Sequence, residues 1–398
     1  MKIAIFSDCH MGFDYGGPRG EDSFSAFEEA LEKSKDADMI LVAGDLFDMR
    51  VPRQEVFARG ARILSRVREW DGGAKFESII GKKAEDVSPL SLKGKPMVVI
   101  SGNHDRRSPH LTNPVQALEH AGLLLHLHCS TAVFDIEGRK VAVHGMSAVP
   151  ERYAKEVLLS WNPKPLEGAV NIFLIHQNID PYIFNPLEPP SLKLEDLPIG
   201  FDLYVMGHLH WNDTQRFRGK NLLVAGSTTP TGLHKIEAEQ KKGVFFFNGE
   251  YLDFSPLIKQ RKIFWEDAYL SPTIKEDMDR TIGKIVSAET GKPIIVIKVK
   301  GKLPIGAHVP SFRDIELKYD EKALLYIYTN LEGQEFESQL DLIKSLREQR
   351  LSPEEYGLQL LKENLMQAKC GIKVEDIFEL LVEGQTEEIY SGIVGGNK

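Results

Sequence analysis

The sequence has few cysteines, no long apolar run and no excess of positive charge. Its three cysteines, Cys9, Cys129 and Cys370, lie far apart, which argues against a disulfide framework or a zinc site and favours reduced thiols. No apolar stretch approaches the ~18–20 residues that a membrane helix needs, and the strand-like start, residues 1–6, does not resemble a signal peptide. We therefore expect a cytoplasmic protein without a membrane segment.

The net charge of −9 argues against a bulk electrostatic attraction to nucleic acid. Basic pairs such as Lys82-Lys83 and Arg106-Arg107 are more simply explained as solvated surface. A site rich in carboxylates also contributes negative charge, however, so the balance of charge decides little about partners. The 398 residues and the hydrophobic content of 42% are ample for two or three globular domains.

Short apolar runs alternate with amphipathic helical segments in the first part of the chain, and runs of strands follow. This order predicts an α/β fold with two packed mixed β-sheets flanked by helices. Residues 71–95 have no clear period and are expected to form a long surface excursion. We expect helices at 24–35, 54–69 and 114–121, and strands at 2–7, 39–43, 97–100, 141–144, 170–175, 202–206, 222–225, 243–247 and 251–254.

Two smaller units are expected beyond residue 258. The pattern of residues 259–335 predicts a small α/β domain, with a helix at 273–288 and strands at 294–299 and 323–329. Residues 336–398 predict a helical tail, because Ser352-Pro353-Glu354-Glu355 forms a capping box with proline at the first helical position. Two short amphipathic helices cannot bury their apolar faces alone. They either dock on their own protein or bind a partner.

Side chains that bind metals follow the ends of separate predicted strands. The stretch Ser101–Arg107 places Asn103 and its neighbours at the carboxyl edge of a sheet, where α/β proteins bind ligands. Residues two apart in an extended chain point the same way, so Asp8 and His10 can face one site while Cys9 points into the core. The candidate ligands are Asp8, His10, Asp45, Asn103, His176, His208 and His210.

Imidazole, carboxylate and amide groups together suit Mn²⁺, Fe²⁺ or Zn²⁺. Seven ligands are too many for one such ion and fit two ions that share a carboxylate, an arrangement for in-line phosphoryl displacement. A single histidine at a strand end is more often a packing or surface residue, but seven coincidences at strand ends are hard to explain that way. His104 could donate a proton, with Asp105 orienting it from behind. Six other histidines lack a companion pattern and are assigned to packing or surface roles: His110, His120, His126, His128, His234 and His308. His144 ends a predicted strand and could border the site, but it is not part of the ligand set.

The order Asp-x-His, Gly-Asp, Gly-Asn-His-Asp, a lone His and Gly-His-x-His resembles the calcineurin-like metallophosphoesterases. A finer resemblance, strong over residues 1–250, is to the SbcD-type ("meiotic recombination eleven") nucleases of DNA double-strand-break repair. It rests on Gly44–Phe47 followed by Pro52, on Gly102–Arg106, and on Gly226–Thr228 ahead of Glu237 and Lys242-Gly243. The resemblance implies a metallophosphoesterase nuclease domain at 1–258, a DNA-capping domain at 259–335 and an ATPase-binding segment at 336–398.

The resemblance also implies roles for single residues. It assigns Asp8, His10, Asp45 and His210 to one metal and Asp45, Asn103, His176 and His208 to the other, with Asp45 bridging. His104 would act as general acid or stabilise the transition state, oriented by Asp105. Family members are commonly Mn²⁺-dependent and pair with an SMC-like coiled-coil ABC ATPase. Family members form homodimers, and the candidate surface is the helix that begins near Thr112.

Asp48 departs from the pattern, because most relatives have histidine after Gly-Asp-Leu-Phe. A carboxylate there would repel phosphate and could serve as a further metal ligand or support a ligand from behind. The resemblance therefore implies a two-metal DNA endonuclease, with 3′–5′ exonuclease activity less secure. One alternative is a bimetal phosphatase or cyclic-nucleotide phosphodiesterase. Another is a DNA-end-bridging scaffold with weak catalysis.

Overall fold

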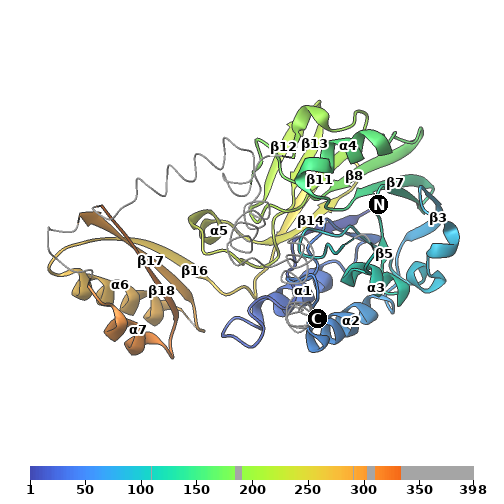
Figure 1. The fold of residues 1–398 in the computed structure, drawn as a ribbon. Helices are drawn as coiled ribbons and strands as arrows, with labels where there is room; N and C mark the ends of the chain where they lie inside the picture. Colours follow the sequence, from blue (N-terminus) through green and yellow to red (C-terminus); the bar gives the residue numbers. More distant parts are fainter. Residues whose placement is uncertain (109, 184–190, 290, 303–309, 333–398) are drawn as a thin grey trace, which may run out of the picture. The chain divides into compact units, whose positions relative to one another are not determined.

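The computed structural model describes residues 1–108, 110–183, 191–289, 291–302 and 310–332. Figure 1 labels many of their helices and strands. The predicted C-terminal helices, His308 and Cys370 lie outside these residues. The chain divides into two compact units. Among the described residues, one consists of Met1–Val149, Glu156–Gln177 and residues 198–332, and the other of Pro150–Lys155 and residues 178–183 and 191–197.

The first sheet contains the amino terminus and has the strand order β15-β14-β1-β2-β4-β5. Strands β1, β2, β4 and β5 are parallel, whereas β14 and β15 continue the sheet antiparallel beyond β1. Parallel strands end at one edge, so the loops after β1, β2 and β4 meet there. The bounds are β1 Ile3–Phe6, β2 Met39–Val42, β4 Met97–Val99, β5 Leu125–His126, β14 Gly243–Phe247 and β15 Leu252–Pro256.

The second sheet has the order β12-β13-β11-β8-β7-β6-β3. Its central strands β7, β8, β11 and β13 are parallel, and antiparallel strands flank them on both sides. Both sheets are therefore mixed, as the sequence predicted. The bounds are β3 Ala74–Ile80, β6 Ser130–Ile136, β7 Arg139–Met146, β8 Ala169–Ile175, β11 Leu203–Met206, β12 Asp213–Phe217 and β13 Lys220–Val224.

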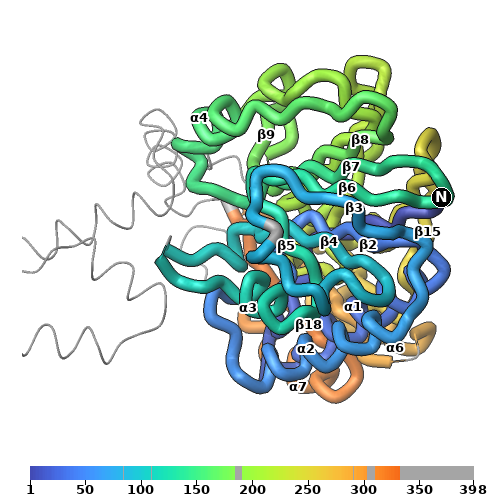
Figure 2. Tube along the Cα trace, turned by 90° about the vertical axis from the view of Figure 1, so that its right-hand side faces the viewer, coloured from blue at the N-terminus to red at the C-terminus, as the bar shows by residue number. Residues whose placement is uncertain are grey.

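Alternation along β1 explains how the layers stack. Ala4 and Phe6 face a core shared with α1 and α2, while Ile3 and Ile5 face a second core that lies between the two sheets. Every one of these side chains is fully buried, which is typical of a strand covered on both faces. Figure 2 shows the layers in order, with α1 and α2 first, then β2 and β4, then β7 and β8.

The helices follow from their apolar spacing. In α1 (Asp22–Lys33), Phe24, Phe27 and Leu31 recur at helical intervals and are buried. In α3 (Pro114–His120), Asn113 and Gln116 form a capping box. Three further helices accompany the two sheets: α2 Gln54–Val67, α4 Glu151–Trp161 and α5 Lys235–Glu239. The first residues of α4 belong to the second unit.

The segment at residues 71–95 was predicted to be a surface excursion, and this is partly wrong. Ala74–Ile80 forms β3, which pairs antiparallel with β6 at the edge of the second sheet. Most of its side chains are exposed or half-buried, so an apolar pattern is absent and the strand could not be recognised. Two short 3₁₀ helices, Ala84–Asp86 and Pro89–Leu92, complete the segment.

The residues after the two-sheet part form a small parallel sheet of order β16-β17-β18. Ile295, Ile297 and Val299 of β17 pack with residues of α6 and α7 on one face. The bounds are β16 Ile263–Tyr269, α6 Ile274–Ala288, β17 Ile294–Lys302, α7 Arg313–Tyr319 and β18 Leu324–Glu332. The described residues of the other unit include a parallel pair, β9 Ile179–Asp180 and β10 Leu192–Lys193, and a 3₁₀ helix, Leu194–Asp196. None of the helices in the described ranges has the length and apolarity to cross a bilayer.

Candidate metal centre

The loops after β1, β2 and β11 use left-handed backbone where the candidate ligands stand. The φ angles are 51° for Asp8, 46° for His10, 48° for Asp45 and 79° for His208. Non-glycine residues adopt this region at a cost, and such residues cluster at functional sites. The prediction that Asp8 and His10 converge is confirmed, but the reason given, an extended chain, is wrong. A tight left-handed loop brings them together.

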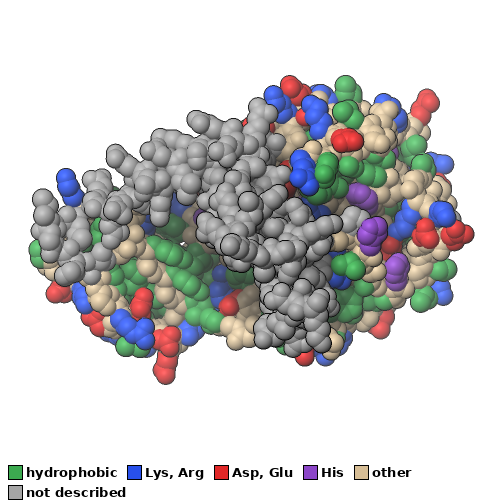
Figure 3. All heavy atoms as spheres, viewed as in Figure 1, with side chains coloured by type: hydrophobic (Ala, Val, Ile, Leu, Met, Phe, Trp, Pro, Cys, Tyr) green, Lys and Arg blue, Asp and Glu red, His purple; other side chains and the backbone are tan. Residues whose placement is uncertain are grey.

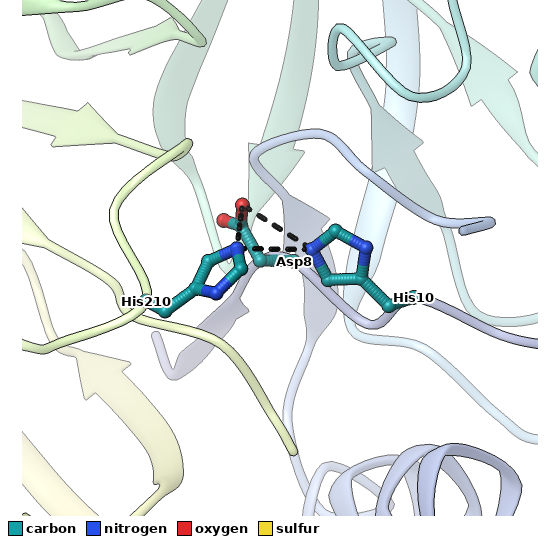
Figure 4. A group of neighbouring side chains, drawn as sticks. All are labelled: Asp8, His10 and His210. Carbon is teal, nitrogen blue, oxygen red and sulfur yellow. Dashed lines mark hydrogen bonds and ion pairs between the residues drawn. The ribbon is translucent and has the colours of Figure 1, made fainter. Parts of the chain in front are cut away.

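Asp8, His10 and His210 form the first cluster of ligand atoms, drawn in Figure 4. The Nε2 atoms of His10 and His210 lie 3.1 Å apart. Asp8 Oδ1 lies 4.0 Å from His10 Nε2 and 3.9 Å from His210 Nε2. This buried oxygen has no hydrogen-bond partner within the described structure. An unpaired carboxylate oxygen facing two imidazole nitrogens is the arrangement that a bound cation satisfies.

Asn103, His176 and His208 form the second cluster together with Asp45. Asn103 Oδ1 lies 3.0 Å from His176 Nε2 and 2.9 Å from His208 Nδ1. His176 Nδ1 donates to the carbonyl of Ala43 at 2.7 Å, which turns Nε2 toward the cluster. The three loops after β4, β8 and β11 thus direct amide and imidazole groups at one point.

Asp45 belongs to both clusters. Its Oδ2 lies 3.3 Å from His176 Nε2 and 3.9 Å from His10 Nε2, while its Oδ1 accepts a hydrogen bond from the His104 N–H at 2.8 Å. Burial opposes the charged form, but His176 and His104 hold the pKa of Asp45 well below its usual range. The carboxylate is therefore anionic and placed between the two clusters.

The ring of His104 is oriented differently from the prediction. Its Nδ1 donates to the backbone carbonyl of Asp48 at 2.7 Å. The predicted orienting group, Asp105, instead accepts backbone hydrogen bonds from Leu46, Phe47 and Gly102 at 3.0 Å each. Asp105 therefore ties the loop after β2 to the loop after β4, and the expectation that it orients His104 is wrong. Burial and the nearby Asp45 raise the pKa of Asp105 to about 6.

Two glycines are required because the loops approach each other closely. A Cβ atom at Gly102 would overlap the carboxylate and backbone nitrogen of Asp45. A Cβ atom at Gly207 would overlap the Ala43 carbonyl and the ring of His176. The glycines of the Gly-Asn-His-Asp and Gly-His-x-His motifs thus make room for the ligands contributed by neighbouring loops.

A buried ion pair behind His210 was not assigned a role from the sequence. Lys242 Nζ donates to the His210 carbonyl at 2.6 Å and to Glu237 Oε2 at 3.0 Å, and Thr231 Oγ1 lies 2.8 Å from His210 Nδ1. Burial would raise the pKa of Glu237, but His210 and Lys242 lower it to about 2. In the sequence, Glu237 and Lys242 were noted only as part of the resemblance to the nuclease family. No local spacing connects them to His210.

Two further histidines are buried in hydrogen-bonded positions: His126, for which a packing role was predicted, and His144, which was expected to border the site. His126 Nε2 lies 3.0 Å from Ser101 Oγ, and His144 lies 2.8 Å from Thr131 Oγ1 and 3.1 Å from Asn171 Oδ1. Burial lowers the pKa of His126 to about 3 and that of His144 to about 4. Both rings are neutral and hydrogen-bonded, and neither belongs to the clusters of potential ligands found among the described residues.

Residues 1–212 match the family model described as calcineurin-like phosphoesterase. The chain belongs to this family. Membership confirms the resemblance carried by the strand-end motifs and implies that the protein binds divalent metal, for which the clusters described above offer groups of potential ligands. The donor set fits such an ion, because the unpaired buried oxygen of Asp8 faces imidazole nitrogens of His10 and His210, and carboxylate and imidazole groups are ligands of divalent metals.

Curated relatives are DNA double-strand break repair proteins named Mre11. The protein from Methanopyrus kandleri is 27% identical over 271 residues, which cover 63% of this chain and 53% of that one. The protein from Sulfurisphaera tokodaii is 25% identical, with 76% and 74% covered. The human protein is 26% identical, with 68% and 43% covered. The chain thus spans about half the length of the first of these relatives.

Proposed function

We propose that this protein is a DNA nuclease that uses two divalent metal ions, with Mn²⁺ as the expected metal. The observation that carries the proposal is the position of Asp45, whose Oδ2 lies within 3.9 Å of a ligand nitrogen in each cluster. One carboxylate between two clusters supports a pair of ions with a shared ligand. Two such ions activate water and neutralise the charge of a phosphodiester during in-line displacement.

In this proposal the residues divide between the two ions around Asp45. Asp8, His10 and His210 join Asp45 at one position, and Asn103, His176 and His208 join it at the other. The distances that support this division are those between Nε2 of His10 and His210 and those around Asn103 Oδ1.

His104 is proposed to act on the leaving oxygen. A carbonyl can only accept, so the bond to Asp48 fixes the proton on His104 Nδ1. Nε2 therefore faces away from that bond and is available to stabilise the developing charge or to deliver a proton when the ring is protonated.

DNA is proposed as the substrate because the relatives are break-repair proteins. Over the described residues on the face drawn in Figure 3, lysine and arginine side chains are interspersed with aspartate and glutamate, so we propose local contacts to the DNA backbone without sequence readout. On the small sheet, Lys298 and the exposed Tyr328 alternate with the residues that face α6 and α7. This supports a DNA-capping role for residues 259–335.

We further propose that residues 336–398 bind an SMC-like coiled-coil ABC ATPase and that the nuclease works as a homodimer within that complex. Endonuclease activity and 3′–5′ exonuclease activity on break ends are both part of the proposal. We also propose that residues 1–258 form the nuclease domain.

The test is hydrolysis of linear double-stranded DNA, circular single-stranded DNA and a small chromogenic phosphodiester, with and without Mn²⁺. Wild type is compared with His104→Ala and with the matched surface variant His120→Ala, whose histidine is exposed. We expect Mn²⁺-dependent cleavage of both DNAs that only His104→Ala abolishes. Hydrolysis of the small diester alone would favour a phosphatase or cyclic-nucleotide phosphodiesterase. DNA binding with no hydrolysis of any substrate would favour an end-bridging scaffold.

A further inference from the structure

Asp48 contacts both His10 and His104, through different parts of the residue. Its carboxylate Oδ1 lies 3.1 Å from Nδ1 of His10. Its backbone carbonyl accepts a hydrogen bond from Nδ1 of His104 at 2.7 Å. We infer that the Asp48 carboxylate is a positioning group for His10 and that the Asp48 carbonyl independently positions His104.

The contact with His10 sets the proton on that ring. An ionised carboxylate only accepts hydrogen bonds, so Nδ1 of His10 is the donor and Nε2 is left toward Asp8 and His210. Nε2 is the nitrogen that lies 3.1 Å from His210 Nε2 and 4.0 Å from Asp8 Oδ1. A carboxylate behind a ligating histidine fixes the ring orientation and makes the other nitrogen a better ligand.

The contact with His104 depends on backbone that other residues hold in place. The N–H groups of Leu46 and Phe47 both donate to Asp105, and the N–H of Asp48 itself donates to the Met11 carbonyl at 3.2 Å. The chain up to Asp48 is therefore fixed by bonds that do not involve the Asp48 side chain. Replacing that side chain should loosen His10 and leave His104 where it is.

The proposal rests on the proposed metal centre, although not on DNA being the substrate. It also gives the departure from the resembled family a physical meaning. The Asp48 side chain is 24% exposed, and its carboxylate is engaged by His10 instead of being presented to a phosphate as a separate charge. Asp48 is then a support for one ligand and not a ligand itself.

The first measurement is Mn²⁺ binding to the full chain by isothermal titration calorimetry, without DNA. Asp48→Ala should weaken one class of site about 10–100-fold and leave the other unchanged. Asp48→Asn keeps an acceptor oxygen for His10. We therefore expect it to weaken Mn²⁺ binding by no more than about 3-fold, less than Asp48→Ala does. Asp36→Ala, which removes an exposed aspartate after α1, is the matched control. Asp48→Ser, too short to reach His10, replaces Asp48→Ala if that variant does not fold.

Equal weakening in the alanine and asparagine variants would overturn the proposal, because Asp48 would then act through its charge as a direct ligand. Unchanged binding in both would overturn it as well, and so would a wild type that binds no Mn²⁺.

The second measurement separates the two contacts. At Mn²⁺ concentrations that saturate Asp48→Ala, hydrolysis of the chromogenic diester should return to within a few-fold of wild type, whereas His104→Ala should stay inactive at any Mn²⁺ concentration. Asp48→Ala that is metal-loaded but inactive would overturn the independence of the two contacts. Wild type that binds Mn²⁺ without hydrolysing any diester would instead refute the proposed function, and the binding result for Asp48 would stand.

Discussion

The Nε2 atoms of His10 and His210 face each other at 3.1 Å, beside an oxygen of Asp8 that accepts no hydrogen bond within the described structure. The two rings can share one proton in a hydrogen bond, but the buried Asp8 oxygen is left without a partner and costs stability. We expect a cation bound at this cluster to recover that stability.

Addition of Mn²⁺ should accordingly raise the thermal midpoint, and EDTA should lower it. A ligand at 100 times its dissociation constant stabilises the native state by about 2.7 kcal/mol. His210→Ala should shrink the shift, which differential scanning calorimetry measures. An EDTA-treated protein with an unchanged midpoint would contradict this prediction.

Removing His176 should cost one ion and spare the other. His176 Nε2 lies near Asn103 Oδ1 and Asp45 Oδ2, away from the cluster of Asp8 and His210. We expect Mn²⁺ per chain, measured by equilibrium dialysis and elemental analysis, to fall from two to one in His176→Ala. Loss of both ions, or of neither, would speak against two separable positions.

Gly102→Ala should inactivate the protein although it adds a single methyl group. The new Cβ would overlap the carboxylate and backbone nitrogen of Asp45, so the shared ligand must move. A displacement of about 1 Å at a reacting centre can cost about 10²-fold in rate, which steady-state hydrolysis of a small diester would show. Gly283→Ala, within α6 and with only the Tyr319 hydroxyl nearby, is the matched control and should leave the rate unchanged.

Lys242→Met should destabilise the fold more than its size suggests. The Lys242 and Glu237 side chains are 3% and 1% exposed, so the single change leaves a carboxylate buried without its partner. Breaking a buried pair in this way costs about 3–5 kcal/mol. The free energy of unfolding, measured by urea denaturation, should recover in part in the double variant Lys242→Met/Glu237→Gln. Equal losses in the single and double variants would show that the pair is not coupled.

The buried neutral His144 should make stability depend on pH. Burial lowers its pKa from 6.5 to about 4 in the folded chain, so the unfolded chain binds the proton more readily. The free energy of unfolding is therefore not reduced by His144 above pH 6.5. As the pH falls from 6.5 toward 4, protonation of His144 in the unfolded chain lowers the free energy of unfolding by up to ~3 kcal/mol. His144→Gln, compared with wild type in urea at pH 4 to 7, should show a smaller loss on acidification. Parallel curves for the two proteins would refute the assignment.

The structure brings the candidate ligands predicted from the sequence together, but through a local geometry that the sequence did not predict. Asp8, Asp45, Asn103, His176 and His208 could be found because each follows an apolar run, and strand ends meet at one edge of a sheet. The backbone conformation of the loops could not be predicted from the sequence. Asp8 and His208 have left-handed φ angles, but aspartate and histidine at these positions are equally expected as metal ligands and so do not reveal the conformation.

The wrong prediction for Asp105 and the missed role of Lys242 both arise from contacts between segments that are distant in the sequence. Asp105 stands next to His104 in sequence, yet its carboxylate serves backbone N–H groups of Leu46 and Phe47. The role of Lys242 depends on the His210 carbonyl, a contact that no spacing predicts. Strand β3 was missed for a different reason, because its side chains lie on a half-exposed edge and the apolar signal of a covered strand is absent.

The metal centre draws its side chains from both sheets. The loops after β1, β2 and β4 of the first sheet carry Asp8, Asp45 and Asn103, while the loops after β8 and β11 of the second carry His176 and His210. A folding intermediate in which only one sheet has formed holds at most four of the seven candidate ligands, too few for two ions. High-affinity binding of Mn²⁺ should therefore be a late event that reports the docking of the two sheets, and the ions would then slow their separation.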